Sequence, residues 1–391
     1  MKEQEMTDNR SGHRLSAVLF LTGLILIALY TDFVFVRYKL SGEPDLSYWT
    51  QDSEADTEAE YTACMPGKLV FLSANGGISK LCGIREVNGI VRMKNGQLTA
   101  VNSKIDETQL RAEADKVGQL YEWLKANDTA FLYVAVPVKE DKDHSELPTG
   151  FADHVNDNMD VFLEELDRWD VPYMDMRQVL KESGSDIYSC FYNTDHHWTT
   201  QTGFYAYTRI TEQIEKELGI ELEDSLTDPK NFRFTTYDKV FLGSRGKRVG
   251  VLYGGMDDFT MILPLFTTSF YDADSGETGT FEDFMVNEKY VKEDPDFLAS
   301  DIYDYALKSR PHIINMLSKN GPDVVLVSDS MGFAVQPYLA LASSKLDFVS
   351  AYEAGMVSTV VKNTHPDIVV MIHSAEFILP LEESFDFGPE Q

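Results

Sequence analysis

Basic residues are scarce in this chain of 391 residues. It has 34 Lys and Arg against 64 Asp and Glu, which gives a formal net charge of −30. A surface with this balance repels phosphate backbones and anionic membrane faces. We therefore expect no nucleic-acid partner.

Cysteine is also rare. The three residues Cys64, Cys82 and Cys190 form no Cys-x-x-Cys pair, which excludes a zinc ribbon and a thioredoxin-like motif. Cys64 and Cys82 could form a disulfide outside the cytoplasm, but three free thiols explain the sequence equally well. Phe191 and Tyr192 indicate that the neighbouring Cys190 is a packed residue rather than a nucleophile.

A long apolar run occurs near the N-terminus. A helix over residues 15–36 would have about 22 residues, enough to cross ~30 Å of hydrocarbon. Basic residues on both sides give weak support for a cytoplasmic segment 1–14. We predict an uncleaved transmembrane signal-anchor over 15–36. A cleaved signal peptide would need a small-residue cleavage site, which the sequence lacks here. The length of the run, its position and its lack of a polar face disfavour a buried core helix.

The rest of the chain is organised as one large domain. Acidic residues among Ser, Thr and Ala predict a solvated linker over residues 37–63. Short apolar runs then alternate with amphipathic helix patterns, which predicts an α/β domain over 64–380. Residues 232–284 are rich in Gly, Thr and aromatics and indicate a β-rich insertion. Residues 381–391 form an acidic tail.

Apolar spacing places individual elements in this domain. The predicted strands are Phe131–Val138, Val171–Met174, Val249–Tyr253, Phe259–Leu263, Val324–Val327, Phe348–Val349 and Ile368–Ile372. The predicted helices are Asp106–Asn127, a stripe over Met159–Trp169, one capped by Thr199 or Thr200, Pro337–Ser343 and Val357–Lys362.

The run Asp195-His196-His197-Trp198 lies just before one of these helices. An Asp two residues from a His can orient the imidazole through one ring nitrogen and leave the other free as a base. The same residues could instead form a zinc site or a structural histidine pair. Trp198 could line a pocket or anchor the loop.

A second polar run, Ser328-Asp329-Ser330-Met331-Gly332, follows a predicted strand. Sites in open α/β sheets collect at the carboxyl ends of strands. Ser330 there would combine a nucleophilic hydroxyl with the backbone N–H groups of a turn. Gly332 would let the backbone approach a substrate oxygen. Alone this run could be a helix cap, but with the Asp-x-His pattern it favours a Ser-His-Asp triad.

The Asp-His-His-Trp run followed by strand-Asp-Ser-x-Gly resembles the DHHW family of bacterial surface proteins. These are similar to the SGNH-hydrolase-like domain of alginate O-acetyltransferases. The resemblance covers roughly residues 87–377 and is supported by 131–138, 241–248 and 365–370. It implies a three-layer α/β domain with a mainly parallel sheet.

Carried over by position, the resemblance implies that Ser330 is the nucleophile and His197 the general base. Asp195 would orient His197, whereas His196 matches a variable position and is assigned no catalytic role. The sequence departs from the family at three places that affect the oxyanion hole. These are Ser328, Met331 and Phe333, where Gly, an aromatic residue and Asn are usual.

Other polar residues have weaker signals. Arg245 and Arg248 could bind an anionic substrate group, or they could belong to a solvated basic loop. For His365 and His373, which flank the last predicted strand, we expect structural roles.

The resemblance implies an O-acyltransferase, with acetyl as the expected group and an exported or cell-wall polysaccharide as acceptor. It implies a membrane-bound O-acyltransferase as the partner that supplies the acyl group, and no metal or other cofactor. An esterase with the same triad and a non-catalytic surface or polysaccharide-binding module are the alternatives.

Overall fold

The computed structural model describes residues 2–41, 65–293, 302–318, 320–378 and 385–387. They belong to two compact units, residues 1–75 and 76–391. Most of the predicted linker 37–63, most of the tail 381–391 and Cys64 lie outside the described residues. The possible disulfide with Cys82 therefore does too.

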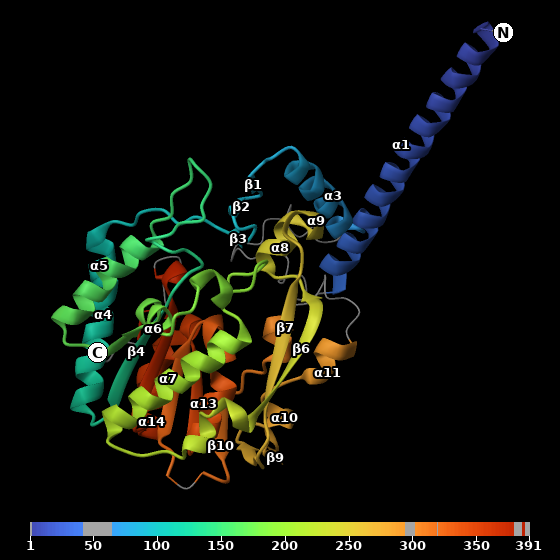
Figure 1. The fold of residues 1–391 in the computed structure, drawn as a ribbon. Coiled ribbons are helices and arrows are strands. Elements are labelled where there is room, and N and C mark those ends of the chain that lie inside the picture. Colours follow the sequence, from blue (N-terminus) through green and yellow to red (C-terminus); the bar gives the residue numbers. More distant parts are fainter. Residues whose placement is uncertain (1, 42–64, 294–301, 319, 379–384, 388–391) are drawn as a thin grey trace. The chain divides into compact units, whose positions relative to one another are not determined.

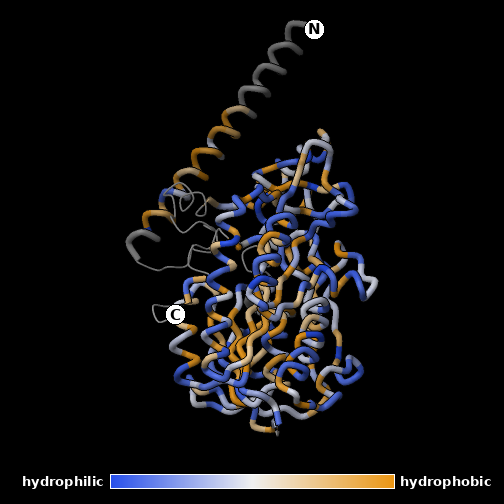
Figure 2. Tube along the Cα trace, turned by 90° about the vertical axis from the view of Figure 1, so that its left-hand side faces the viewer, coloured by the Kyte–Doolittle hydropathy of each residue, from blue (hydrophilic) through white to orange (hydrophobic). Residues whose placement is uncertain are grey.

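The first unit contains a long helix, α1 (Lys2–Ser41). Its segment Ala17–Arg37 has 21 residues and a mean hydropathy of 2.2, and only 6% of it is buried. Figure 2 shows these apolar residues along the middle of the helix. By length and composition the segment is able to cross a membrane, and a signal sequence would have the same properties.

Eight of the described strands in the second unit form one mixed sheet (Figure 1). In chain order they are β4 (Ala130–Val136), β5 (Tyr173–Asp175), β8 (Phe270–Asp272), β9 (Glu277–Gly279), β10 (His312–Asn315), β11 (Asp323–Ser328), β12 (Lys345–Ser350) and β13 (Ile368–Ser374). Their spatial order is β5-β4-β13-β11-β12-β10-β8-β9. The first five run parallel, and the last three extend the sheet with antiparallel pairs.

The smaller strands form separate sheets. β1 (Glu86–Val87), β2 (Ile90–Arg92) and β3 (Leu98–Thr99) make one, and β6 (Phe232–Phe241) pairs with β7 (Asp257–Pro264) in another. The predicted insertion 232–284 thus contains β6 and β7, but also β8 and β9 of the large sheet.

Helices cover both faces of the large sheet. The helices after α1 are α3 (Lys68–Leu81), α4 (Glu107–Ala126), α5 (Val155–Arg168), α6 (Met176–Glu182), α7 (Thr200–Leu218), α8 (Ser244–Val249), α9 (Val251–Gly254), α10 (Phe281–Phe284), α11 (Glu288–Glu293), α12 (Ile302–Ala306), α13 (Gln336–Ala342) and α14 (Val357–Thr364). Successive side chains of a strand point to opposite faces. In β4, Leu132 and Val134 belong to the core beneath α7 and α13, whereas Phe131 and Tyr133 belong to the core beneath α4, α5 and α14. The predicted three-layer α/β fold is confirmed.

Capping residues set the predicted helix ends. Asp106, the first residue of the predicted helix, accepts a hydrogen bond from the Thr108 amide at the start of α4. At the start of α7, the Thr199 side chain accepts a hydrogen bond from the Thr202 amide. This helix ends at Gly219, which lies in the left-handed region with φ 63°.

The prediction of a strand over Val249–Tyr253 is wrong. The segment forms the end of α8 and the short helix α9, joined at Gly250 with φ 81°. Val249 and Tyr253 are buried and Leu252 is exposed. In the sequence Val249, Val251 and Tyr253 are apolar at every second position, which imitates the period of a strand. Over five residues this pattern cannot be distinguished from a pair of tight helical turns.

Candidate active site

The loop before α7 is folded into a narrow hairpin. Phe191 pairs with Trp198 in an antiparallel bridge, and the Tyr192 amide donates to the His197 carbonyl at 3.2 Å. Asp195 lies at the tip of this hairpin and is fully buried. The hairpin therefore fixes the backbone on both sides of the Asp-x-His pattern.

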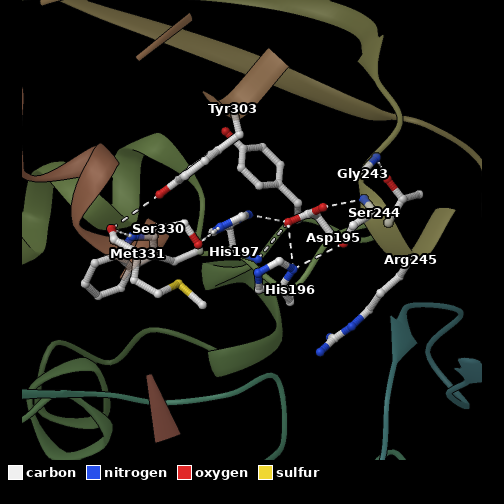
Figure 3. A network of polar contacts seen from close by, with 12 residues as sticks. Asp195, His196, His197, Gly243, Ser244, Arg245, Tyr303, Ser330 and Met331 are labelled. Atoms are coloured by element: carbon white, nitrogen blue, oxygen red, sulfur yellow. Dashed lines mark hydrogen bonds and ion pairs between the residues drawn. The ribbon is translucent and has the colours of Figure 1, made fainter. Parts of the chain in front are cut away.

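The predicted triad residues meet in this structure (Figure 3). His197 Nδ1 lies 2.5 Å from Asp195 Oδ1, and His197 Nε2 lies 2.7 Å from Ser330 Oγ. Ser330 lies two residues after the end of β11 and begins the 3-10 helix η5 (Ser330–Ala334). The fold thus joins residues 133 positions apart in one chain of hydrogen bonds.

Asp195 is surrounded by donors. Its Oδ1 also accepts the His197 amide at 2.9 Å, and its Oδ2 accepts the Ser244 amide at 2.5 Å. A Cβ atom at Gly243 would lie 2.3 Å from the Asp195 Cβ, so only glycine leaves room there. Burial raises the pKa of Asp195, but the charges of His196 and His197 and the hydrogen bonds from His197 outweigh it and hold the pKa well below its usual value.

His196 is held in the neutral form. Its Nδ1 lies 3.2 Å from Ser244 Oγ. Burial, and then the charge of His197, lower the pKa of His196 to about 3. Asp195, His196 and His197 offer ligand atoms within 4.8 Å of one another, as a metal site would. An ion bound through His197 would have to displace Asp195 or Ser330 from its ring.

The turn that carries Ser330 is fixed by its neighbours. Asp329 accepts the Met331 amide at 2.9 Å and the Ser374 amide at 2.7 Å. The Met331 carbonyl in turn accepts the Trp198 indole N–H at 3.0 Å and the Tyr303 hydroxyl at 3.4 Å. Trp198 has no exposed surface, which favours the anchoring alternative over a pocket wall.

Tyr303 of α12 is a site residue that the sequence did not reveal. Its ring stacks on the His197 ring, with centroids 4.0 Å apart and an interplanar angle of 12°. No motif surrounds Tyr303 in the sequence, so only the folded chain brings it to the imidazole.

The two predicted substrate-binding arginines contact the protein itself. The Arg245 guanidinium is buried and donates to both oxygens of Glu376, at 2.8 and 2.9 Å. In Figure 3 its side chain runs below His196, and no dashed line joins it to the triad. Arg248 is exposed and donates to the Asn88 carbonyl at 2.8 Å. The alternative of a solvated basic loop therefore does not describe Arg245.

Gly332 has a packing role in the turn. A Cβ atom there would lie 2.2 Å from Ser328 Oγ, and the Gly332 amide already donates to the Asp329 carbonyl at 3.1 Å. Phe333, the departure next to it, is partly buried against Phe348. Gly332 thus leaves room for the Ser328 side chain.

Cys190 and His373 have the packed positions that the sequence indicated, whereas His365 is exposed. Cys190 is buried. His365 ends α14 with φ 47°, and His373 lies fully buried in β13.

Known proteins share this architecture. A family model for the SGNH hydrolase-like domain of acetyltransferase AlgX matches residues 96–239. PatB1 from Bacillus cereus superposes with a TM-score of 0.60 at 17% identity, covering 74% of this chain and 96% of PatB1. A DHHW family protein from Eubacterium siraeum superposes with a TM-score of 0.56 at 17% identity, covering 78% and 98% of the two chains.

The α/β unit has an SGNH hydrolase-like fold. The predicted resemblance is confirmed by this match and by the shared fold. The matched residues contain Asp195 and His197 and end before Ser330. No curated protein matches the chain.

Proposed function

We propose that this SGNH hydrolase-like domain is an O-acyltransferase that moves an acetyl group to a hydroxyl of a polysaccharide. Ser330 is the nucleophile, His197 the general base and Asp195 the group that orients the base. The observation that carries this proposal is the unbroken chain Asp195 Oδ1, His197 Nδ1, His197 Nε2, Ser330 Oγ, with steps of 2.5 Å and 2.7 Å.

In the first half-reaction Ser330 Oγ attacks the acyl carbonyl carbon of the donor. His197 Nε2 takes the Ser330 proton and delivers it to the departing group, which leaves the acyl group as an ester on Ser330. Asp195 is held as a carboxylate and accepts the His197 Nδ1–H, which fixes the tautomer with a free Nε2. The Ser330 amide at the start of η5 is the donor that we assign to the oxyanion.

In the second half-reaction a sugar hydroxyl replaces the donor. His197 Nε2 takes its proton, the oxygen attacks the ester carbon, and Ser330 leaves with the proton from His197. The product is an O-acetylated glycan and free enzyme. Water in place of the sugar would make the same site an esterase, so the choice between transfer and hydrolysis depends on the acceptor.

The apolar segment Ala17–Arg37 supports a membrane location for this reaction. We propose that it anchors the domain on the outer face of the cell membrane, with residues 1–14 in the cytoplasm. A membrane-bound O-acyltransferase would supply the acyl group there, and an exported or cell-wall polysaccharide would receive it.

The test is turnover of p-nitrophenyl acetate by the full chain in detergent micelles. Ser330→Ala and His197→Ala should each lower kcat by about 10³-fold or more. Ser189→Ala, at an exposed serine of the 3-10 helix Ile187–Cys190 before the triad hairpin, is the matched control and should keep wild-type turnover. Equal turnover in all four proteins would reject the triad.

A second assay separates transfer from hydrolysis. Mass spectrometry of an added oligosaccharide should show acetylation that depends on Ser330, and hydrolysis alone would favour the esterase. Incubation with a zinc chelator should leave both rates unchanged, whereas a loss reversed by zinc would favour the metal-site alternative.

A further inference from the structure

A buried lysine lies beneath the triad loop. Lys139 follows β4 and is 1% exposed. Its ammonium group donates to the carbonyls of Leu98 at 2.9 Å, Asn193 at 3.2 Å and Asp195 at 2.7 Å, and also to that of Tyr192. Three of these four carbonyls belong to the loop that carries Asp195, so the loop backbone is wrapped around one positive charge.

A buried carboxylate binds the opposite side of the same loop. Asp257, the first residue of β7, accepts the Asn193 amide at 2.7 Å through Oδ1. Its Oδ2 accepts the Thr194 amide at 2.7 Å and the Thr194 hydroxyl at 2.6 Å. Asp257 is 8% exposed, so these donors replace most of its contact with water.

Two successive peptide groups therefore connect the two charges. In the peptides 192–193 and 193–194, the carbonyl faces Lys139 and the N–H faces Asp257. Rotation of either peptide would turn its carbonyl toward the carboxylate and its N–H toward the ammonium. In a poorly solvated interior such a reversal is strongly unfavourable, so the charges define a single backbone orientation.

The same contacts hold both the backbone carbonyl and the side-chain carboxylate of Asp195. Lys139 binds the Asp195 carbonyl directly. Thr194 accepts the Gly243 amide at 2.9 Å through its hydroxyl and the Gly246 amide at 2.8 Å through its carbonyl. This contact holds the segment whose next amide, that of Ser244, binds Asp195 Oδ2.

We propose that Lys139 and Asp257 are positioning residues that hold the loop 192–195 in the one backbone orientation in which the Asp195 carboxylate meets His197. The kinetic part of this inference rests on the proposed function. Its geometric part, the hydrogen bond between His197 and Asp195, does not.

The experiment measures both parts in the full chain at pH 6. Thr194→Val keeps the side-chain volume and removes the hydroxyl that joins Asp257 to Gly243. Lys139→Met and Asp257→Asn each remove one charge. Arg177→Met is the matched control, because it removes a partly buried cation paired with Asp175 in α6, outside this loop.

The readouts are kcat and KM for the ester and the low-field proton NMR signal of His197 Nδ1–H, recorded also in the Ser330→Ala background. In Thr194→Val, Lys139→Met and Asp257→Asn we expect the NMR signal to shift or disappear. We also expect kcat to fall about tenfold or more, with KM within twofold of the wild-type value. Arg177→Met should lower the melting temperature and leave signal and kcat unchanged.

Wild-type signal and kcat in Thr194→Val and Asp257→Asn would overturn the proposal. If Lys139→Met gives no cooperative melt, the near-isosteric Thr194→Val decides. A domain without acyl transfer would still show the NMR response, so failure of the proposed function is distinguishable from failure of this inference.

Discussion

Two segments of this domain, the loop 193–198 and the helical segment 244–248 of α8, bury ionisable side chains with different outcomes. In the loop 193–198, hydrogen bonds run from buried Asp195 through His197 to the hydroxyl of Ser330, which is partly exposed. In the segment 244–248, the buried guanidinium of Arg245 ends on Glu376 of the same domain.

The difference shows what distinguishes a reactive group from a structural one. Both segments contain buried charged side chains that are paired with other protein groups, so burial and pairing alone do not identify a site. The loop 193–198 ends on a nucleophile that a substrate can reach, whereas Arg245 ends on a second protein charge that neutralises it. The following variants test this distinction.

The largest effect is expected for Asp195→Asn. An amide cannot accept the His197 Nδ1–H while also accepting the amides of His197 and Ser244, so the imidazole would adopt the wrong tautomer. We expect kcat for ester turnover to fall about 10⁴-fold with folding retained. Asp106→Asn, which preserves the cap of α4, is the control. A loss smaller than tenfold would mean that the chain of hydrogen bonds does not serve catalysis.

Acid should destabilise the domain through His196. Its pKa is about 3 when folded and about 6.5 when unfolded, so between these values the unfolded chain binds the extra proton. Stability is then lost as the pH falls from 6.5 to 3, by at most about 5 kcal/mol. Melting temperatures of the wild type and His196→Asn over this range provide the test. Parallel pH curves for the two proteins would contradict a buried neutral His196.

The variant Arg245→Met tests the segment 244–248. It would leave Glu376 without the cation that, against the effect of burial, lowers its pKa. We expect a loss of about 3–5 kcal/mol in the free energy of unfolding, because an uncompensated buried charge remains. Activity of the folded fraction should stay within about tenfold.

Denaturant titration of Arg245→Met and of Arg245→Met/Glu376→Gln distinguishes this outcome from a substrate contact. The double variant should regain part of the stability. A large rise in KM at unchanged stability would restore Arg245 as a substrate-binding residue.

The sequence predicted most of the helices and strands, because these depend on the local period of apolar residues. The helix Asp106–Asn127 and most of the apolar strands followed from local period, and they agree with α4 and the core strands. The Asp-x-His spacing already contains the geometry of its own hydrogen bond, because His197 donates both its amide and its ring N–H to Asp195. Ser330 could be added because it follows a buried strand.

Contacts made at long range were not predictable in the same way. Tyr303 reaches His197, and Lys139 reaches the triad loop, only through the order of strands in the folded sheet. Lys139 begins the charged run 139–143 after the apolar run 131–138, so the sequence indicated neither its burial nor its acceptors. The basic neighbours of Arg245 suggested an exposed side chain. In the structure Arg245 is buried, because it pairs with Glu376, which lies 131 positions away in the sequence.

The smallest effect is expected for Arg248→Ala. Arg248 is the exposed arginine of the segment 244–248, and its guanidinium donates to the Asn88 carbonyl. Solvent replaces such a bond at little cost, so the melting temperature should change by about 2 °C or less and kcat/KM for the small ester by less than about twofold. The informative assay adds an anionic oligosaccharide acceptor. An unchanged KM would mean that the segment 244–248 does not bind substrate, in contrast to the loop 193–198. A tenfold rise in KM for this acceptor alone would show that Arg248 binds substrate beyond the triad.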